Sequence, residues 1–364
     1  MAWQIPQSVT QAGTVADLGT TDSVFVASGV TIASTASTTI FGTGSSNEVL
    51  VYGTVATTAS IAIRLGGGTV TISPGGQVHT FGVASLAIVF FEANSHLTNA
   101  GLISAPTGTG IRIGGISATT TSTIDNSGTI DATSFAIFGS NGTTETILLQ
   151  NSGEISGDGA AYSRTGAVAR DVVTNTGQMI GDILLGPGND AYNGAQGRLS
   201  GDVLAGDGND VVTGGIDNDI FFGDAGNDAL NGGFGNDTLN GGAGNDVLTG
   251  GSGRDTLFGG LDADRFDFNS AKESVKGGNR DRIMDFNRGQ GDKIDLKDID
   301  AESGGGNQKF TWIGKSKFHD EKGELRYIDK GATVIVQGDV NGDGKADFEI
   351  FVNVGALAKG DFIL

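Results

Sequence analysis

Ala205-Gly-Asp-Gly-Asn-Asp210 begins the stretch that decides the fold, a run of seven related hexapeptides ending at Asp264. They read AGDGND, GGIDND, GDAGND, GGFGND, GGAGND, GGSGRD and GGLDAD, each followed by three further residues before the next begins. Their last residues recur every nine positions: Asp210, Asp219, Asp228, Asp237, Asp246, Asp255 and Asp264. Two positions after each aspartate stands a large apolar residue: Val212, Phe221, Leu230, Leu239, Leu248, Leu257 and Phe266. This constant phase argues against a flexible linker and predicts a parallel β-roll.

The residue types of the hexapeptide suit the binding of a cation. Glycine allows positive φ angles and a close approach of the backbone to an ion. Aspartate and backbone carbonyls supply hard oxygens, of which Ca²⁺ takes six to eight. The apolar residue should point inward and its two neighbours outward, because side chains alternate along a strand. We therefore predict calcium-binding turns between short strands.

Two nonapeptides make one coil of 18 residues, so successive turns should fall on opposite edges of the roll. One edge should carry Asp210, Asp228, Asp246 and Asp264, and the other Asp219, Asp237 and Asp255. We predict one ion between each successive pair on an edge. Without ions, each edge is a column of carboxylates about 4.8 Å apart. Their repulsion should couple folding to calcium.

The predicted calcium ligands are the aspartates, with glycines and neighbouring residues that contribute backbone carbonyls. A related turn at 186–190 lies one 20-residue coil before the turn that ends at Asp210, and it predicts a further ion between Asp190 and Asp210. The full predicted set is Gly186, Gly188, Asp190, Gly206, Gly208, Asp210, Gly214, Ile216, Asp219, Gly223, Ala225, Gly226, Asp228, Gly232, Phe234, Gly235, Asp237, Gly241, Ala243, Gly244, Asp246, Gly250, Ser252, Gly253, Asp255, Gly259, Leu261 and Asp264.

The composition limits the class of protein. The 364 residues include 63 glycines, 4 prolines and no cysteine, which excludes disulfides and thiol catalysis. A net charge of −20 argues against nucleic-acid binding and fits a chain that binds several Ca²⁺ ions. The first residues have neither a basic nor an apolar segment, so no secretory signal peptide is expected. The longest apolar run, Leu86 to Phe91, is too short for a transmembrane segment.

Residues 1 to about 200 predict a second, wider solenoid. Short blocks recur around glycines whose spacings are 23, 25, 27, 25, 24 and 20: Gly53, Gly76, Gly101, Gly128, Gly153, Gly177 and Gly197. A loosely kept period of this length is typical of a right-handed parallel β-helix whose loops vary. Asn-small-Gly marks a tight corner. The asparagines at 99, 126, 151 and 175 are expected to stack as a ladder.

We predict three domains: a Thr/Ser/Gly-rich parallel β-helix at 1–184, a calcium β-roll at 185–268 and a small antiparallel β cap at 269–364. No Pro/Ser/Gly linker interrupts the repeats, which favours one continuous rod over two domains joined near 185–205. The end of a solenoid exposes unpaired backbone and needs a cover, which the cap should supply. Within the cap, Ser270 to Val275 is expected to form a short helix.

A loop in the cap resembles the first part of an EF-hand. Asp339-Val-Asn-Gly-Asp-Gly-Lys-Ala-Asp347 places oxygens at positions 1, 3, 5 and 9, with Asp339, Asn341 and Asp343 as candidate calcium ligands. Position 12 is Ile350, so the bidentate glutamate is missing. A weak calcium site and an Asx-rich hairpin turn are both open interpretations.

The N-terminal solenoid offers few residues for catalysis. Between Asp22 and Arg112 the charged residues are only Glu48, Arg64 and Glu92, and His79 and His96 have no charged neighbour in sequence. We therefore expect no catalytic residues. The alternative is a polysaccharide lyase or epimerase, which would need Tyr, His, Arg and Asp together over a groove. Tyr52 and His79, about one coil apart, are one such pair to examine.

The second half of the chain resembles a known family. The nonapeptides together with A-D-R-F-D-F, D-R-I-M-D-F, G-D-K-I-D-L, D-V-N-G-D-G-K-A-D-F-E-I and the final Asp361-Phe-Ile-Leu364 are similar to RTX proteins, and to the C-terminal region of serralysin-type metalloproteases. The resemblance covers about 185–364. It implies calcium binding and export by a type I (ABC-transporter) apparatus of a Gram-negative bacterium. Serralysins carry His-Glu-x-x-His, which this chain lacks, so protease activity is not implied.

These features predict a secreted, calcium-binding, non-enzymatic β-solenoid that folds outside the cell. Its expected role is structural or adhesive, as a surface-layer, matrix or adhesin protein. The expected partners are calcium, the export apparatus, and either surface polysaccharide or other copies of the chain. No transmembrane segment and no nucleic-acid partner are expected.

Overall fold

The computed structural model describes residues 3–4, 7–91, 94–114, 121–139, 145–166, 169–302 and 307–364. They form two compact units, Met1–Ala205 (unit 1) and Gly206–Leu364 (unit 2). Both units are parallel β-solenoids, as the sequence predicted. In the described ranges the only helices are two 3-10 turns, η1 (Gly277–Asn279) and η2 (Lys359–Asp361), and neither has the length and apolarity needed to cross a membrane. The three-domain division with boundaries after 184 and 268 stays a prediction.

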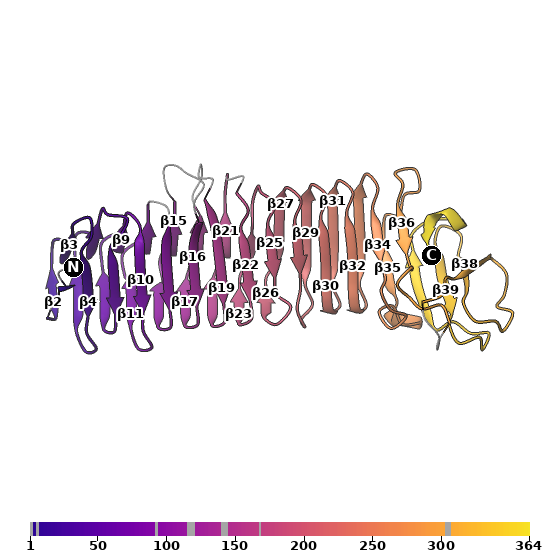
Figure 1. The fold of residues 1–364 in the computed structure, drawn as a ribbon, viewed down its shortest axis with the longest axis horizontal. Coiled ribbons are helices and arrows are strands. Elements are labelled where there is room, and N and C mark those ends of the chain that lie inside the picture. Colours follow the sequence, from indigo (N-terminus) through magenta and orange to yellow (C-terminus); the bar gives the residue numbers. More distant parts are fainter. Residues whose placement is uncertain are drawn as a thin grey trace. The chain divides into compact units, whose positions relative to one another are not determined.

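Unit 1 has three strands per coil, and each strand pairs in parallel with its equivalents in neighbouring coils to form sheets A, B and C (Figure 1). Sheet A contains β1 (Trp3–Gln4), β4 (Ser23–Val26), β7 (Glu48–Val51), β10 (Gly68–Ile72), β13 (Ser95–Asn99), β16 (Thr121–Asn126), β19 (Thr146–Asn151), β22 (Val172–Asn175) and β25 (Ala191–Asn193). Sheet B contains β2 (Val9–Gln11), β5 (Thr31–Ser34), β8 (Thr54–Thr57), β11 (Gln77–Thr80), β14 (Leu102–Ala105), β17 (Thr129–Ala132), β20 (Glu154–Gly157), β23 (Gln178–Ile180) and β26 (Arg198–Ser200). Sheet C contains β3 (Ala16–Leu18), β6 (Ile40–Gly42), β9 (Ile61–Leu65), β12 (Leu86–Phe90), β15 (Thr109–Ile113), β18 (Phe135–Gly139), β21 (Ala160–Arg164), β24 (Ile183–Leu184) and β27 (Val203–Asp207).

The core of unit 1 is a stack of apolar side chains held in register from coil to coil. In sheet A, Val49 pairs with Val70 and Val70 with Leu97, and all three side chains are fully buried. Burying one such side chain stabilises the fold by about 1.5–3 kcal/mol. Stacking therefore lets a chain rich in Thr, Ser and Gly build a continuous core from few large residues.

The predicted asparagine ladder is confirmed at the corner between sheets A and B. Asn99 Nδ2 donates to Asn126 Oδ1 at 2.7 Å, and the same bond joins Asn126 to Asn151 and Asn151 to Asn175, each at 2.8 Å. All four residues are buried. The glycine two positions later is tightly packed, because a Cβ at Gly128 would meet the carbonyl oxygen of Gly101 at 2.2 Å.

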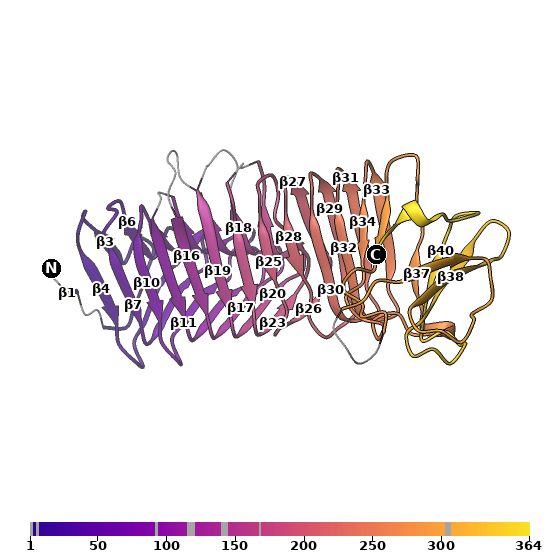
Figure 2. The same ribbon diagram turned by 45° about the vertical axis from the view of Figure 1, so that its right-hand side comes forward.

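Unit 2 begins with two strands per coil (Figure 2). One sheet contains β28 (Val211–Thr213), β30 (Ala229–Gly235), β32 (Val247–Gly253), β34 (Arg265–Asp267), β36 (Lys293–Asp295) and β41 (Phe362–Ile363). The other includes β29 (Ile220–Ala225), β31 (Thr238–Ala243), β33 (Thr256–Leu261), β35 (Asp281–Ile283) and β40 (Phe348–Val352). The registers place Leu230 against Leu248 and Phe221 against Leu239, so the predicted 18-residue coil is confirmed.

The cap is antiparallel only in part. The strands β38 (Glu324–Asp329), β39 (Val334–Asp339) and β40 pair antiparallel, as predicted. However, β35 and β36 pair in parallel with β33 and β34, so they continue the two sheets of the roll. The strand β37 (Thr311–Gly314) also pairs in parallel, with β38. The roll therefore extends beyond its last nonapeptide before the antiparallel strands cover it.

The short helix predicted at Ser270 to Val275 is wrong. Residues 271–273 form a turn, Val275 forms an isolated antiparallel bridge with Phe348, and the 3-10 turn η1 follows at Gly277–Asn279. The Ser274 hydroxyl donates to the carbonyl of Glu349 and accepts from the backbone N–H of Asp281. These two bonds tie the segment to β40 and to the start of β35, so tertiary contacts outweigh a weak local preference for helix.

Candidate metal centre

Five repeat aspartates, Asp228, Asp237, Asp246, Asp255 and Asp264, are each fixed by the coil before them. The backbone N–H of Asp219 donates to Asp237 Oδ1 at 2.9 Å, and that of Asp237 donates to Asp255 Oδ1 at 2.8 Å. The other column has the same bonds, from Asp210 to Asp228, Asp228 to Asp246 and Asp246 to Asp264. The closing aspartates thus form two columns with a step of 18 residues, as the repeat predicted.

The second oxygen of these carboxylates faces a different environment. The Oδ2 atoms that are buried and accept no hydrogen bond belong to Asp228, Asp237, Asp246, Asp255 and Asp264. Asp219 differs, because its Oδ2 accepts the N–H of Gly215 at 3.1 Å. A buried anionic oxygen without a donor is costly, so five side chains with the same unmet need point to a cation.

Burial raises the pKa of the repeat aspartates. Desolvation is the largest cause, and it raises the pKa of Asp228, Asp237 and Asp264 to about 7. Neighbouring carboxylates of the same column add to the rise, as Asp255 and Asp219 do for Asp237. A cation bound beside these carboxylates would offset the cost of burying them and favour their charged form.

The first glycine of each turn leaves room for oxygens to converge. A Cβ on Gly232 would lie 2.2 Å from Asp237 Oδ2 and 2.6 Å from the carbonyl oxygen of Gly250. A Cβ on Gly241 would lie 2.2 Å from Asp246 Oδ2 and 2.7 Å from the carbonyl oxygen of Gly259. The predicted carboxylate and carbonyl ligands thus meet within one small space, which only glycine keeps open.

In most turns the third residue is apolar, so it can contribute only its backbone carbonyl. The side chains of Ile216, Phe234 and Leu261 are exposed to solvent, although large apolar residues are usually buried. No group of three or more His, Cys, Asp or Glu side chains converges anywhere in the described residues. The donors brought together are carbonyl and single carboxylate oxygens, which suit Ca²⁺ better than Zn²⁺ or a soft metal. Bound Ca²⁺ would supply the positive charge that the columns lack.

The structure adds two aspartates that the sequence interpretation missed. The N–H of Asp255 donates to Asp281 Oδ1 at 2.8 Å, and the N–H of Asp264 donates to Asp292 Oδ1 at 3.1 Å. Asp281 Oδ2 is buried without a partner, like that of a repeat aspartate, and burial raises the pKa of Asp281 to about 8. Asp292 Oδ2 accepts the N–H of Asn287, so its column ends there. The sequence did contain a signal for both, because Asp281 and Asp292 are followed two positions later by Ile283 and Ile294, as in the repeats.

A second ladder, also missed, lies outside the aspartate columns. The residue before each aspartate is often asparagine, and its Oδ1 accepts the N–H of the equivalent residue one coil later. Asn227 N donates to Asn209 Oδ1 and Asn236 N to Asn218 Oδ1, both at 2.7 Å. These exposed bonds hold successive turns in register. The asparagine repeated at the fifth position of the hexapeptide was their signal.

Asp190, from the earlier turn of the predicted set, lies in unit 1. Its Oδ1 accepts the N–H of Asp171 at 2.6 Å, and Asp171 Oδ1 accepts the N–H of Ile147 at 2.8 Å. Asp171 Oδ2 accepts the hydroxyl of Tyr162 at 2.7 Å and lies 3.6 Å from Nε of Arg164. Within unit 1, the Asp190 carboxylate is therefore followed by that of Asp171, whose counter-charge is the buried guanidinium of Arg164. The predicted ion between Asp190 and Asp210 stays a prediction.

The EF-hand-like loop connects β39 to β40. Asp339 accepts the N–H of Gly342 at 2.7 Å and that of Gly344 at 2.8 Å, one on each oxygen. Asn341 Oδ1 and Asp343 Oδ1 accept the N–H groups two residues later. These are the bonds of the Asx-rich hairpin. Calcium binding by Asp339, Asn341 and Asp343 stays a prediction.

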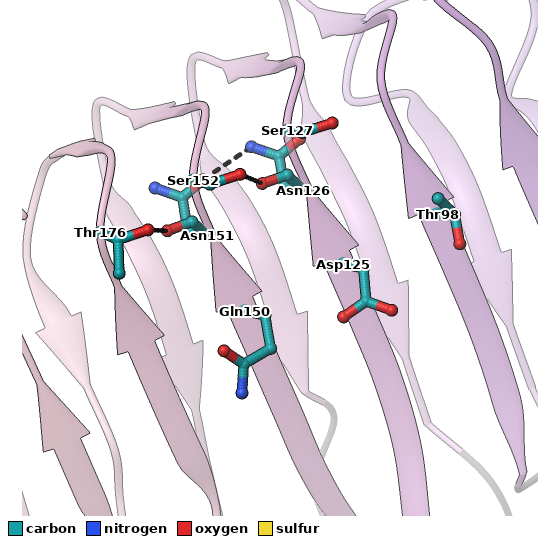
Figure 3. A pocket seen from close by; sticks show the side chains of 8 residues that line it. All are labelled: Thr98, Asp125, Asn126, Ser127, Gln150, Asn151, Ser152 and Thr176. Carbon is teal, nitrogen blue, oxygen red and sulfur yellow. Dashed lines mark hydrogen bonds between the residues drawn. The ribbon is translucent and has the colours of Figure 1, made fainter.

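The polar outer face of sheet A carries a shallow groove of about 170 Å³ next to the asparagine ladder (Figure 3). Thr98, Asp125 and Gln150 project from its floor (Figure 3). His96, in the same sheet, lies 3.9 Å from Asp125, measured from Nε2 to Oδ2. Tyr52 and His79 are not partners, since Tyr52 packs on Phe25 and His79 on Phe81.

The coils and the two columns of carboxylates define a calcium-binding parallel β-roll. The family model of the RTX calcium-binding nonapeptide repeat matches residues 202–230 and 231–266. The chain therefore carries RTX repeats, which bind calcium, and this prediction is confirmed. No curated protein matches the chain. Similar solved structures include two subunits of the mannuronan C5-epimerase of Azotobacter vinelandii, both 26% identical in sequence. AlgE6R3 aligns over 43% of this chain and 78% of its own (TM-score 0.21), and AlgE6R2 over 41% and 88% (TM-score 0.30).

Proposed function

We propose that this chain is a secreted, non-enzymatic β-solenoid with a structural or adhesive role outside the cell. The observation that carries the proposal is the set of buried, unpartnered Oδ2 atoms in the roll. They make the folded roll dependent on calcium, and extracellular calcium modules bind with affinities near millimolar. The chain then folds where calcium is abundant and stays unfolded in the cytosol, where it is scarce.

The aspartate columns support several ions. We propose one ion for each successive pair, with Asp281 extending the column of Asp219, Asp237 and Asp255 by one site. Asp292 adds none, because backbone N–H groups occupy both its oxygens. This charge balance supports a calcium-loaded resting state for a chain with a net charge of −20.

The outer faces of unit 1 support a non-catalytic role. The groove on sheet A is lined, in the described part of the chain, by Thr, Ser, Asn and Gln side chains and a single carboxylate, Asp125. No Tyr, Arg or His contributes to that lining. Such a surface suits contact with a polysaccharide or another copy of the chain, and we propose a surface-layer, matrix or adhesin role on this basis.

One observation favours a polysaccharide lyase or epimerase as the second candidate. His96 and Asp125 lie side by side at the edge of the groove, and Thr123 and Thr98 both hydrogen-bond to the imidazole. A histidine held this way is able to move a proton. Incubation with a panel of polysaccharides, followed by absorbance of unsaturated uronates and NMR of the product, separates the two candidates. We expect no turnover, and turnover lost in His96→Gln would establish the enzyme.

We propose export by a type I apparatus that recognises the segment ending in Asp361-Phe-Ile-Leu364. Asp361 is also a folding element, since Arg288 pairs with it and its Oδ2 accepts the N–H of Ala358. Removal of 361–364 should retain the protein in the cell. Arg288→Gln is the control, because it breaks the same ion pair and leaves the segment intact. Equal retention of both variants would point to lost stability rather than a lost signal.

Electron microscopy of the purified protein during a calcium titration tests the structural role. We expect ordered filaments or sheets above a calcium threshold, and none in magnesium at the same ionic strength. Separate particles at every calcium concentration would contradict a self-assembling layer or matrix. The adhesive role would then be the remaining form of the proposed function.

A further inference from the structure

The outer face of sheet C in unit 1 carries two arginines among apolar side chains. The register places Arg64 beside Val89 and Val89 beside Arg112 on three neighbouring strands, β9, β12 and β15. Adjacent strands lie about 4.8 Å apart, so the two arginines are roughly 10 Å apart along the sheet. Across β6, β9, β12, β15 and β18, these two residues are the only charged ones.

Neither guanidinium is neutralised within the described part of the chain. No ion pair joins Arg64 or Arg112 to a described carboxylate, although acidic residues outnumber basic ones by 42 to 22. The nearest acidic position on the same sheet is Asp17 in β3, which the strand β6 separates from β9. Two cations that no described carboxylate neutralises lie close together on the sheet of a strongly acidic protein, and this points to an anionic ligand.

Aromatic rings orient one of the two cations. The Arg64 guanidinium lies 4.6 Å from the centroid of the Phe91 ring and 5.4 Å from that of Phe41. Stacking on ring faces leaves the edges of a guanidinium, where its N–H groups lie, free to bind. Arg64 thus presents a rigid fork suited to two oxygens of a carboxylate.

Both arginines line one hollow of about 280 Å³. Its apolar lining comes from Ile61, Leu86, Val89, Phe90 and Phe91. Small ligands bind in concave sites that are mostly apolar and contain a few fixed polar groups. The two cations of the hollow lie on neighbouring coils, one on each side of Val89. These features match a short stretch of a linear polymer with repeated negative charges.

We propose that this hollow, the sheet C site, binds a carboxylate-bearing segment of an acidic polysaccharide. Arg64 and Arg112 would each bind one uronate carboxylate, and the apolar lining would contact the C–H faces of the sugars. The proposal deepens the adhesive role and rests on it, because it names the ligand class and the surface that an adhesive solenoid would use.

The test uses the full chain in millimolar calcium and isothermal titration with a hyaluronan octasaccharide, which carries a glucuronate on alternate sugars. Binding should be absent with the carboxyl-reduced octasaccharide. Arg112→Gln should weaken binding at least tenfold, since a charged hydrogen-bonded contact is lost. The double variant Arg64→Gln/Arg112→Gln should abolish it. Arg170→Gln/Arg254→Gln removes the same charge from exposed positions elsewhere and should bind normally.

Other outcomes overturn the proposal. If the wild-type chain did not bind the hyaluronan octasaccharide, or if the two double variants bound it equally well, the proposed sheet C site would be refuted. Equal affinity for free glucuronate would indicate a single-anion site, and equal affinity for a glutamate octapeptide would indicate an acidic peptide ligand. Far-ultraviolet circular dichroism should match wild type in both variants. Turnover in the polysaccharide assay would refute the non-enzymatic adhesive role and does not depend on Arg64 or Arg112, so failure of that role and failure of the sheet C site are distinguishable.

Discussion

The two oxygens of a repeat aspartate have separate tasks. Oδ1 accepts a backbone N–H from the preceding coil and so fixes the side chain in the fold, as between Asp219 and Asp237. Oδ2 is buried, unpartnered and directed to the space beside a glycine. The first task needs only an acceptor, whereas the second needs a negative charge. An exchange of the carboxylate for an amide keeps the acceptor and removes the negative charge, so it distinguishes the two tasks.

Asp237→Asn should keep the bond from Asp219, because the amide oxygen still accepts, but it removes the anionic Oδ2. We expect the calcium concentration at half-folding, followed by circular dichroism, to rise about tenfold, equivalent to 1.4 kcal/mol. Asp224→Asn removes the same charge from an exposed position whose positive φ, 69°, asparagine tolerates. An equal rise in the control would assign the effect to net charge rather than to a ligand.

At this scale the sequence predicted the repeat aspartates and their two columns, because a strict nine-residue period fixes the position of every turn. It missed Asp281 and Asp292, because longer insertions separate them from Asp255 and Asp264 and break the count. Their role depends on β35 and β36 returning to the sheets of the roll. That pairing is a long-range tertiary contact, which no local sequence pattern predicts.

The asparagine ladder is the element that holds the coils of unit 1 at the corner between sheets A and B. Asn151 links three coils, because it accepts from Asn126 and donates to Asn175 and to the carbonyl of Gln178. A buried polar group that loses its partner costs about 1–3 kcal/mol. The ladder therefore stabilises the fold through its continuity as well as through each bond.

Asn151→Ala should lower the free energy of unfolding by roughly 2–4 kcal/mol, since it leaves partners on both neighbouring coils unsatisfied. Gln150→Ala is the matched control, one residue away on the same strand and exposed, and it should change the free energy little. Urea unfolding in calcium, followed by circular dichroism, gives both values. A loss below 0.5 kcal/mol for Asn151→Ala would show that the ladder is dispensable.

The calcium-free roll should respond to pH in an unusual direction. Burial raises the pKa of Asp228, Asp237 and Asp264 to about 7, from about 3.9 in an unfolded chain. A raised carboxyl pKa stabilises the fold fully below the unfolded value, and that contribution is lost as pH rises through the folded value. In chelator, the roll should therefore be more ordered at pH 5 than at pH 8. Identical circular dichroism spectra at the two pH values would contradict the assigned burial.

Elements were predictable where the repeat is regular and less so where it ends. Parallel strands, the 18-residue coil and the asparagine ladder follow from periodicity. The segments after Asp264 have strand-like composition but no period, so their pairing partners stayed open. The parallel pairing of β36 with β41 brings together residues nearly 70 positions apart. Such long-range pairing explains why the antiparallel prediction held only for β38 to β40.

On the scale of the whole molecule, a net charge of −20 opposes compaction until cations bind. The unpaired Oδ2 atoms concentrate that charge in the roll, whereas sheet C of unit 1 carries two arginines that no described carboxylate neutralises. Calcium binding and contact with an acidic polysaccharide therefore fall to different parts of the chain. The nonapeptide repeats predicted calcium binding, and the net charge agreed with it. Neither gave a sign of the arginine pair, because Arg64 and Arg112 come close only when three coils stack.

Amide hydrogen exchange with mass spectrometry, in excess calcium and in chelator at pH 7.5, tests calcium-coupled folding most directly. We expect peptides from 206–266 to be strongly protected in calcium and to exchange rapidly in chelator, with magnesium at equal ionic strength resembling chelator. Peptides from β13, β16 and β19 report separately on the wider solenoid. Equal protection of 206–266 in calcium and in chelator would contradict the account, because the buried carboxylates would then need no calcium to fold.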